Sequence, residues 1–418
     1  MIIPRNWLAS PTGATHLFCD FFTVPGDSGA PNGRAEAWMR AGSHDGRTRL
    51  QRAVARGFDP GPEVRPPVTL VLPPGERPDR LPRGGLGVLL PTYVGRCDAR
   101  DHATMVAHVR DALAEAHAAH PDVPLTVWVG MQYGPGEYEE ALRRLRATAA
   151  VARRGAGPDA LAFAGLALPG PGKLRTVNAA VRAGRDRDYA GWLWIDDDVE
   201  LGPRCLARLL TRFRERGCTG AVGARLVALP RSTPASQVMD RVSGCTVPPG
   251  ACPVAGCMLV ETKVIAGGIP PRRLADDGFV LFELLDPAAR DPLHDLEVLP
   301  GAYCRTYRVG GARDTRRRLR RSLYSHVTCM ADYPRATARR YFRDVLFHGL
   351  WPLAPWDGSR GPLRGALRWT VKAVHFGWFC AVAAGLVARG LTHRPLRSVA
   401  WGDEGGFRRP DTVRPARA

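Results

Sequence analysis

Three consecutive carboxylates, Asp196, Asp197 and Asp198, follow a short apolar run near the middle of the chain. The run, residues 192–195, has the composition of a buried strand, and α/β proteins place reacting groups where such strands end. Adjacent carboxylates suit a hard cation, because Mg2+ takes one or two protein carboxylates and completes its shell with water and substrate phosphates. In a continuing strand Asp196 and Asp198 would share a face. The alternative is a solvated acidic turn that caps the following helix.

A glycine-rich turn and an amphipathic helix are predicted for residues 170–181, upstream of these carboxylates. The first N–H groups of such a helix attract an anion. Lys173 is one of three lysines in a chain whose other cations are arginine, and Asn178 borders the apolar stripe, where a polar side chain needs a partner. Taken alone, the segment is explained more simply as an ordinary loop and helix.

A second acidic group, the acidic pair Asp276 and Asp277, precedes a predicted apolar helix downstream. A carboxylate that faces a cleft can act as general base on an acceptor hydroxyl. Capping of the helix explains one carboxylate of the pair, but it does not require both.

Arginines are concentrated in residues 313–326. On a helix, Arg317, Arg320 and Arg321 lie on neighbouring turns, from which their guanidinium groups can bind a diphosphate. A basic solvated surface explains the cluster equally well.

The elements that must position these side chains alternate between strand and helix from residue 84 onward. Short apolar runs occupy residues 87–91, 125–130, 161–168, 192–195 and 221–229. Periodic helical segments between them predict an α/β fold with an open, doubly wound, mostly parallel sheet. We expect a catalytic domain over residues 84–340, an N-terminal extension and linker over 1–83, and a C-terminal helical region over 341–418.

Residues 369–388 form a long apolar and aromatic segment that Lys372 and His375 interrupt. The segment is long enough to cross a bilayer, whereas its flanking arginines favour a helix that lies in the interface against anionic headgroups. A spanning helix, an interfacial helix and a helix packed on the soluble domain stay open as alternatives.

The net charge of +19 raises the question of nucleic-acid binding. Nearly all of the positive charge is arginine, which together with abundant Ala, Gly and Pro is typical of GC-rich coding, so we expect no nucleic-acid partner. Anionic lipid or a phosphate-bearing substrate suits the charge at least as well. The N-terminus lacks the features of a secretory signal, which predicts a cytoplasmic protein, with peripheral or single-pass attachment to the cytosolic membrane face left open.

The order of these motifs resembles that of the family 2 glycosyltransferases, which have the GT-A fold. The likeness covers roughly residues 84–325 and runs from a strand that ends in Pro91 and Tyr93 to the arginine cluster. It implies an inverting transfer of a sugar from a nucleoside-diphosphate sugar to an acceptor hydroxyl, with bound Mn2+ or Mg2+. The acceptor, lipid-linked or otherwise, stays open.

The resemblance also implies roles for individual residues. It places the metal at Asp198 and Asp196, with Asp277 as catalytic base and Asp276 beside it. The residues implied on the donor side are Pro91, Tyr93, Lys173, Asn178, Asp196, Asp197, Arg317, Arg320 and Arg321. The three arginines match a QxxRW-like element loosely, because neither Gln nor Trp is present.

Two departures from the family pattern limit the prediction. Members usually carry an Asp against the nucleobase after the second strand, whereas residues 127–136 here contain Gln132 as the candidate base contact. The missing QxxRW element argues against a processive polymer synthase. Two other classes stay open: a nucleotidyltransferase that acts on a sugar phosphate, and a non-catalytic protein that binds nucleotide sugars.

Overall fold

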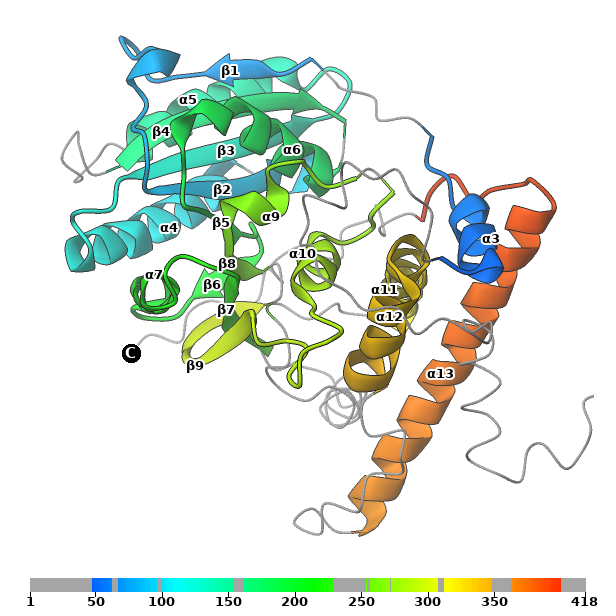
Figure 1. Ribbon diagram of the computed structural model, residues 1–418. Coiled ribbons are helices and arrows are strands. Elements are labelled where there is room, and N and C mark those ends of the chain that lie inside the picture. Colours follow the sequence, from blue (N-terminus) through cyan, green and yellow to red (C-terminus); the bar gives the residue numbers. More distant parts are fainter. Residues whose placement is uncertain are drawn as a thin grey trace, which may run out of the picture.

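The computed structural model describes residues 47–61, 67–96, 99–152, 161–170, 172–228, 253, 256–270, 272–306, 312–347 and 362–399. These residues form one open sheet of nine strands with helices on both of its faces, and a further group of helices lies beside the sheet (Figure 1). The α/β class predicted from the alternation of apolar runs and helical patterns is therefore confirmed.

The strands follow the order β1-β4-β3-β2-β5-β8-β7-β9-β6 across the sheet. Their bounds are β1 Thr69–Val71, β2 Leu86–Tyr93, β3 Leu125–Tyr133, β4 Leu161–Pro169, β5 Gly191–Ile195, β6 Val199–Leu201, β7 Ala221–Ala228, β8 Cys257–Glu261 and β9 Leu296–Thr306. All five predicted apolar runs lie on strands, although residue 229, the last of the fifth run, lies outside the described residues.

The sheet is mostly parallel, as predicted, in the sense that six of its nine strands point in the same direction. The pairs β2–β3, β2–β5, β3–β4 and β7–β9 run parallel. The pairs β1–β4, β5–β8, β7–β8 and β6–β9 run antiparallel. Strands β2, β3, β4, β5, β7 and β9 thus share one direction, and their carboxyl ends meet at one edge, where α/β sheets bind ligands.

The α-helices vary in length from a single turn to the long α13. Their bounds are α3 Arg49–Gly57, α4 Ala99–Ala119, α5 Tyr138–Ala152, α6 Lys173–Ala183, α7 Cys205–Glu215, α9 Thr262–Ile265, α10 Asp276–Leu284, α11 Ala312–Asp332, α12 Arg335–Arg340 and α13 Pro362–Leu391. Short 3-10 turns lie at η2 Pro78–Arg80, η3 Val94–Arg96 and η4 Arg185–Arg187, and a π-helical turn at η5 Tyr341–Leu346.

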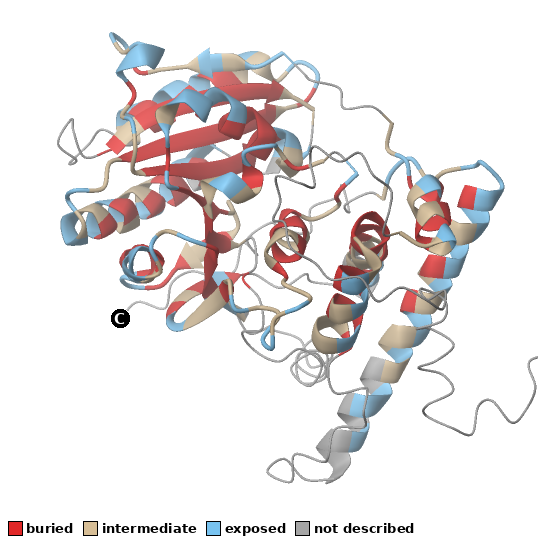
Figure 2. Ribbon diagram, viewed as in Figure 1, coloured by how far each residue is buried: buried red, intermediate tan, exposed pale blue. Residues whose placement is uncertain are grey.

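Two layers of apolar side chains bury the central strands on both faces (Figure 2). Val88 and Leu90 of β2 join one layer with side chains of α4, α5 and α7, whereas Leu89 between them joins the other layer with side chains of α6, α10 and α11. Successive residues of a strand point to opposite faces, so a strand covered on both sides needs an uninterrupted apolar run. This is why the central strands were recognisable in the sequence.

The segment predicted as an N-terminal extension contributes to the sheet and to the helical group. Strand β1 pairs with β4 as the edge strand of the sheet. Helix α3 packs against α11 and α13, and the buried amide of Gln51 donates hydrogen bonds to the carbonyls of Met330 (2.7 Å) and Tyr333 (3.0 Å). Helices α3, α11 and α13 therefore form one unit, which we call the helical unit.

Helix α13 contains the predicted segment 369–388. Its residues Ala373–Leu391 have a mean hydropathy of 1.4, and within the described part of the chain they form the one helix long and apolar enough to cross a membrane. Length and composition alone are weak evidence for a membrane span, because a core helix of a soluble protein passes the same test.

Candidate functional site

Asp196, Asp197 and Asp198, which we call the acidic triad, lie between two strands. Strand β5 ends at Ile195, Asp197 and Asp198 form the turn, and β6 begins at Val199. The Asp196 backbone N–H donates a hydrogen bond to the carbonyl of Gly256 (3.0 Å), which fixes the end of β5 beside β8. The expectation that Asp196 and Asp198 share one face of a continuing strand is therefore wrong, because the strand stops one residue before the first carboxylate.

The glycine-rich turn before α6 has a backbone that requires glycine. Gly172, the N-cap residue of α6, has a backbone φ of 141°, which residues other than glycine rarely adopt. Gln132 of β3 holds this turn, because its Oε1 accepts a hydrogen bond from the Gly172 N–H (2.8 Å) and its Nε2 donates to Thr176 Oγ1 (2.5 Å). The Gln132 amide, proposed from the sequence as a base contact, thus pairs with the loop that presents Lys173.

Lys173, the first residue of α6, connects the acidic triad to the acidic pair. Its Nζ lies 2.5 Å from Asp196 Oδ1 and 2.8 Å from Asp276 Oδ2. The side chains of Lys173 and Asp196 are each 27% exposed, whereas that of Asp276 is 8% exposed. We call these three residues the Lys173 cluster. It brings together three segments that the sequence analysis had singled out separately.

The electrostatics of the Lys173 cluster are dominated by carboxylates. Burial raises the pKa of Asp196 to about 7, and Asp198 and Asp276 add to this rise while Lys173 opposes it. Burial would lower the pKa of Lys173, but Asp196 and Asp276 outweigh that effect and hold the pKa above its ordinary value. One ammonium group therefore faces a surplus of negative charge.

The two carboxylates of the acidic pair occupy the first turn of α10. The N-cap residue of that helix is Ala275, which makes no side-chain cap, so neither aspartate is an N-cap. Negative charge in a first helical turn is favourable because the helix dipole is positive there. Asp276 is buried and held by Lys173, whereas the partly exposed Asp277 accepts a hydrogen bond from the Gly278 N–H (2.7 Å).

Asn178 of α6 positions the segment that leads to the acidic pair. Its Nδ2 donates to the Ile269 carbonyl (2.8 Å), and its Oδ1 accepts from the Ile269 N–H (2.7 Å). The amide is buried and pairs with both polar groups of one residue, so Asn178 fixes the backbone ahead of residues 272–277. The sequence had indicated only that Asn178 needs a partner.

Residues 272 and 273 belong to a second charged cluster, which no local pattern in the sequence predicts. Asp332 Oδ2 lies 2.9 Å from Arg272 Nε and 2.8 Å from Arg273 Nη1, and its Oδ1 lies 3.7 Å from Arg47 Nη1. The Asp332 side chain is 3% exposed, and the Arg273 guanidinium stacks 4.7 Å above the ring of Tyr333. We call these four charged residues the Asp332 cluster. The chain contains many arginines, so the sequence around Asp332 does not predict which of them pair with it.

The predicted arginine cluster lies on α11, near the segment that carries the acidic pair. Arg321 Nη2 donates a hydrogen bond to the Leu274 carbonyl, two residues before Asp276. The Arg320 guanidinium lies 5.6 Å above the ring of Tyr324 on the same helix. Arg317 also belongs to α11, but its side chain lies outside the described residues.

Pro91 and Tyr93 lie at the carboxyl end of β2, as predicted from the sequence. Pro91 is in register with Gly130 of β3 and Tyr93 with Gln132. The Tyr93 hydroxyl approaches Gly134, since a Cβ built on that glycine would lie 3.1 Å from it. The end of β2 thus adjoins the end of β3, from which Gln132 holds the turn before Lys173.

The donor chemistry of this site fits a divalent metal. Asp196 and Asp198 supply hard carboxylate oxygens, and Mg2+ or Mn2+ needs only one or two of these when phosphates and water complete its shell. Within the described ranges, no three His, Cys, Asp or Glu side chains are grouped closely enough to hold a metal by themselves. The surplus of carboxylate charge around Lys173 favours an additional cation here.

Comparisons with known proteins place this chain in no family. No protein-family model matches the chain, and no curated protein matches it. Among solved structures, it is similar to a mannosyltransferase from Pyrobaculum calidifontis in complex with GDP-Man and Mn2+, at 17% identity over 82% of this chain and 93% of that chain, with a TM-score of 0.41. A UTP-bound UGPase from Acinetobacter baumannii is 13% identical over 53% of this chain and 86% of that chain, with a TM-score of 0.28.

An active-site mutant of LgtC is 12% identical over 53% of this chain and 86% of that chain, with a TM-score of 0.27. At TM-scores this low, these similarities assign neither a family nor a reaction.

Proposed function

We propose that this protein is a glycosyltransferase that moves a sugar from a nucleoside-diphosphate sugar to an acceptor hydroxyl, with inversion at the anomeric carbon. The observation that supports this most is the bridge that Lys173 makes between Asp196 and Asp276. It joins the glycine turn, the acidic triad and the acidic pair near the carboxyl ends of parallel strands. Sugar transfer needs a group that binds the donor diphosphate, ligands for a metal, and a base. We propose that these three segments supply them together.

Asp198 and Asp196 are the residues proposed to hold Mn2+ or Mg2+. When bound, such an ion would stabilise negative charge on the departing diphosphate. Lys173, already held between two carboxylates, adds a fixed positive charge beside the same place. We assign Asp197, Pro91 and Tyr93 to the side of the site that binds the donor. Asn178 contributes to that side indirectly, through the backbone that it positions.

Asp277 is the proposed base. Its carboxylate takes the proton of the acceptor hydroxyl as that oxygen bonds to the anomeric carbon, and the bond between this carbon and the diphosphate oxygen breaks. Asp276 is held by Lys173, which leaves Asp277 better placed for proton transfer. The guanidinium groups of Arg317, Arg320 and Arg321 are proposed to bind the diphosphate, and the transfer is proposed to be non-processive.

A thermal-shift screen of nucleotide sugars, with and without Mn2+, tests donor binding. A true donor raises the melting temperature with the logarithm of its concentration once that concentration exceeds Kd, and the rise should depend on the metal. Product analysis with the donor found then separates the classes. Release of nucleoside diphosphate supports sugar transfer, release of pyrophosphate indicates a nucleotidyltransferase, and donor binding without turnover indicates a binding protein.

A further inference from the structure

Helix α13 exposes an unusual amount of apolar surface. Seven large hydrophobic residues are exposed in the described part of the chain, and four of these lie on α13: Trp369, Val374, Trp378 and Leu391. Trp378 is 46% exposed and Val374 53%. Tryptophan is costly to leave in water, which makes this concentration on one helix informative.

Among the α13 side chains that the structure describes between Thr370 and Ala388, the exposed ones carry no charge. Between Thr370 and Ala388, the exposed side chains that the structure describes are those of Thr370, Val374, Gly377, Trp378, Ala381, Ala384, Gly385 and Ala388. A surface helix of a soluble domain normally turns charged and polar residues toward water. We call these eight residues the outer face, and its composition indicates that something other than water covers it.

The opposite side of α13 is packed against protein. Phe379, Ala383 and Leu386 are buried, and the backbones of α3 and α13 touch at two glycines. A Cβ built on Gly57 would lie 1.9 Å from the Leu386 carbonyl oxygen, and one built on Gly390 would lie 1.9 Å from that of Ala53. Helix α13 is therefore locked to α3 along its C-terminal half.

This packing argues against a helix that spans a bilayer. Helix α3 carries Arg49 and Arg56 exposed on its surface, and it would have to follow α13 into the hydrocarbon. Charged side chains at that depth are strongly unfavourable. A helix that is packed on one side and apolar on the other suits an interface, where only the outer face enters the lipid.

The charge around α13 indicates the kind of surface that would complement the outer face. The segments 47–61 and 362–399 contain ten Lys or Arg residues and one acidic residue, Asp59. Their net charge of +9 is nearly half of the chain's +19, on 53 of its 418 residues. Arg389 is exposed in the last turn of α13, and Arg394 is exposed three residues after the helix ends. Cations beside an apolar face complement anionic headgroups above acyl chains.

We propose that the outer face of α13 docks into the headgroup boundary of an anionic lipid bilayer, without crossing it. Trp369 and Trp378 enter the boundary region, where tryptophan is favoured, and the arginines at the end of α13 contact the lipid headgroups. This inference is independent of the proposed reaction, because it rests on the helical unit alone.

Vesicle flotation of the full chain tests the proposal. The protein should float with phosphatidylcholine vesicles that contain phosphatidylglycerol, float poorly with pure phosphatidylcholine, and dissociate as salt rises. Ala381→Asp places a charge on the outer face and should lower vesicle partitioning by about tenfold or more. Ala114→Asp is the matched control, because Ala114 is an exposed alanine within α4, a helix that packs on the sheet. This variant should float like the unmodified protein.

Four results would overturn the proposal. Absence of flotation with anionic vesicles would exclude lipid docking, and equal losses in the two variants would exclude the outer face as the contact. Attachment that survives high salt and carbonate extraction would indicate a spanning helix. Sedimentation that shows a dimer without vesicles, dispersed by Ala381→Asp, would assign the outer face to a second copy of the chain.

Discussion

Two charged clusters share the short segment 272–277, and they have opposite surpluses of charge. The Lys173 cluster has one cation and two carboxylates, and Asp197, Asp198 and Asp277 add three more carboxylates next to it in the sequence. The Asp332 cluster has three guanidinium groups and one carboxylate. Both contain residues of this one segment, but only the first has a deficit of positive charge that a cation can fill.

Asp196 and Asp332, one carboxylate from each cluster, differ in access to solvent. In the Lys173 cluster the side chains of Lys173 and Asp196 keep 27% of their surface exposed, whereas Asp332 keeps 3%. A buried carboxylate that is paired with arginines fixes structure, because removal of either partner leaves an unpaired charge in the interior. A partly exposed cluster can exchange its partners for ligands. We therefore expect substitutions in the first cluster to change chemistry and substitutions in the second to change stability.

Asp332→Ala should have the largest effect on stability. It leaves Arg273, which is 6% exposed, without its carboxylate partner, and it should cost about 3–5 kcal/mol. Urea denaturation measures the loss. Asp122→Ala is the control, because its ion pair with Arg214 is exposed and should change stability little. A loss in Asp332→Ala no greater than in this control would contradict a structural role for the Asp332 cluster.

Asp198→Ala should show the opposite pattern. It removes a proposed metal ligand without creating a cavity, so stability should hardly change while donor turnover falls by at least about a hundredfold. Turnover assays over a Mn2+ titration measure the effect, with Asp79→Ala as a control for loss of an exposed carboxylate. Unchanged Mn2+ dependence in Asp198→Ala would remove Asp198 from the metal site.

Asp277→Asn and Asp276→Asn separate the roles of the two carboxylates of the acidic pair. Asp277→Asn keeps size but cannot accept a proton, so kcat should fall by roughly a hundredfold while donor binding is retained. Asp276→Asn removes one charge from the Lys173 cluster and should weaken stability and donor binding together. Single-turnover kinetics with a donor of known Kd distinguish a slower chemical step from weaker donor binding. A selective fall of kcat in Asp276→Asn instead would reverse the assignment of the base.

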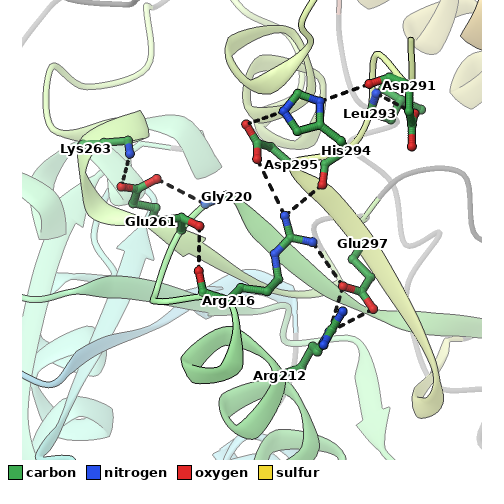
Figure 3. A network of polar contacts seen from close by, with 11 residues as sticks. Arg212, Arg216, Gly220, Glu261, Lys263, Asp291, Leu293, His294, Asp295 and Glu297 are labelled. Atoms are coloured by element: carbon green, nitrogen blue, oxygen red, sulfur yellow. Dashed lines mark hydrogen bonds and ion pairs between the residues drawn. The ribbon is translucent and has the colours of Figure 1, made fainter. Parts of the chain in front are cut away.

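Glu297→Gln should have the smallest effect. Glu297 binds Arg212 Nε at 2.9 Å and Arg216 Nη1 at 3.1 Å in a partly exposed network (Figure 3). Its loss at neutral pH should cost about 1 kcal/mol or less. Burial would raise the pKa of Glu297, but the two arginines outweigh it and hold the pKa below 4.5.

Because the folded-state pKa of Glu297 is lowered, its contribution to stability is fully present above the ordinary glutamate pKa and is lost as the pH falls through the lowered folded-state pKa. The stability difference between Glu297→Gln and the unmodified protein should therefore shrink over that range in urea denaturation. A difference that grows on acidification would contradict the ion-pair interpretation.

The sequence by itself determined the elements of the fold and the motifs of the site. Apolar runs located strands β2, β3, β4, β5 and β7, because a strand buried on both faces must be apolar at successive positions. Helical periodicity indicated helices between these strands. In α4 and α7 the apolar residues at helical spacing, among them Val109 and Leu113 of α4 and Leu209 and Phe213 of α7, are buried. The acidic triad and acidic pair stood out because charge follows or precedes an apolar run. These are local patterns, and neighbouring residues are enough to produce them.

The tertiary structure alone decided which side chains meet. Lys173 with Asp276, Asn178 with Ile269, and Arg273 with Asp332 are contacts between residues far apart in the chain, and no local pattern encodes them. Any of the chain's many arginines can pair with a given aspartate, so composition and spacing leave the pairing undetermined until the path of the backbone is known. The same holds for α3 and α13, whose two contact glycines are ordinary in the sequence and become necessary only where the two backbones touch.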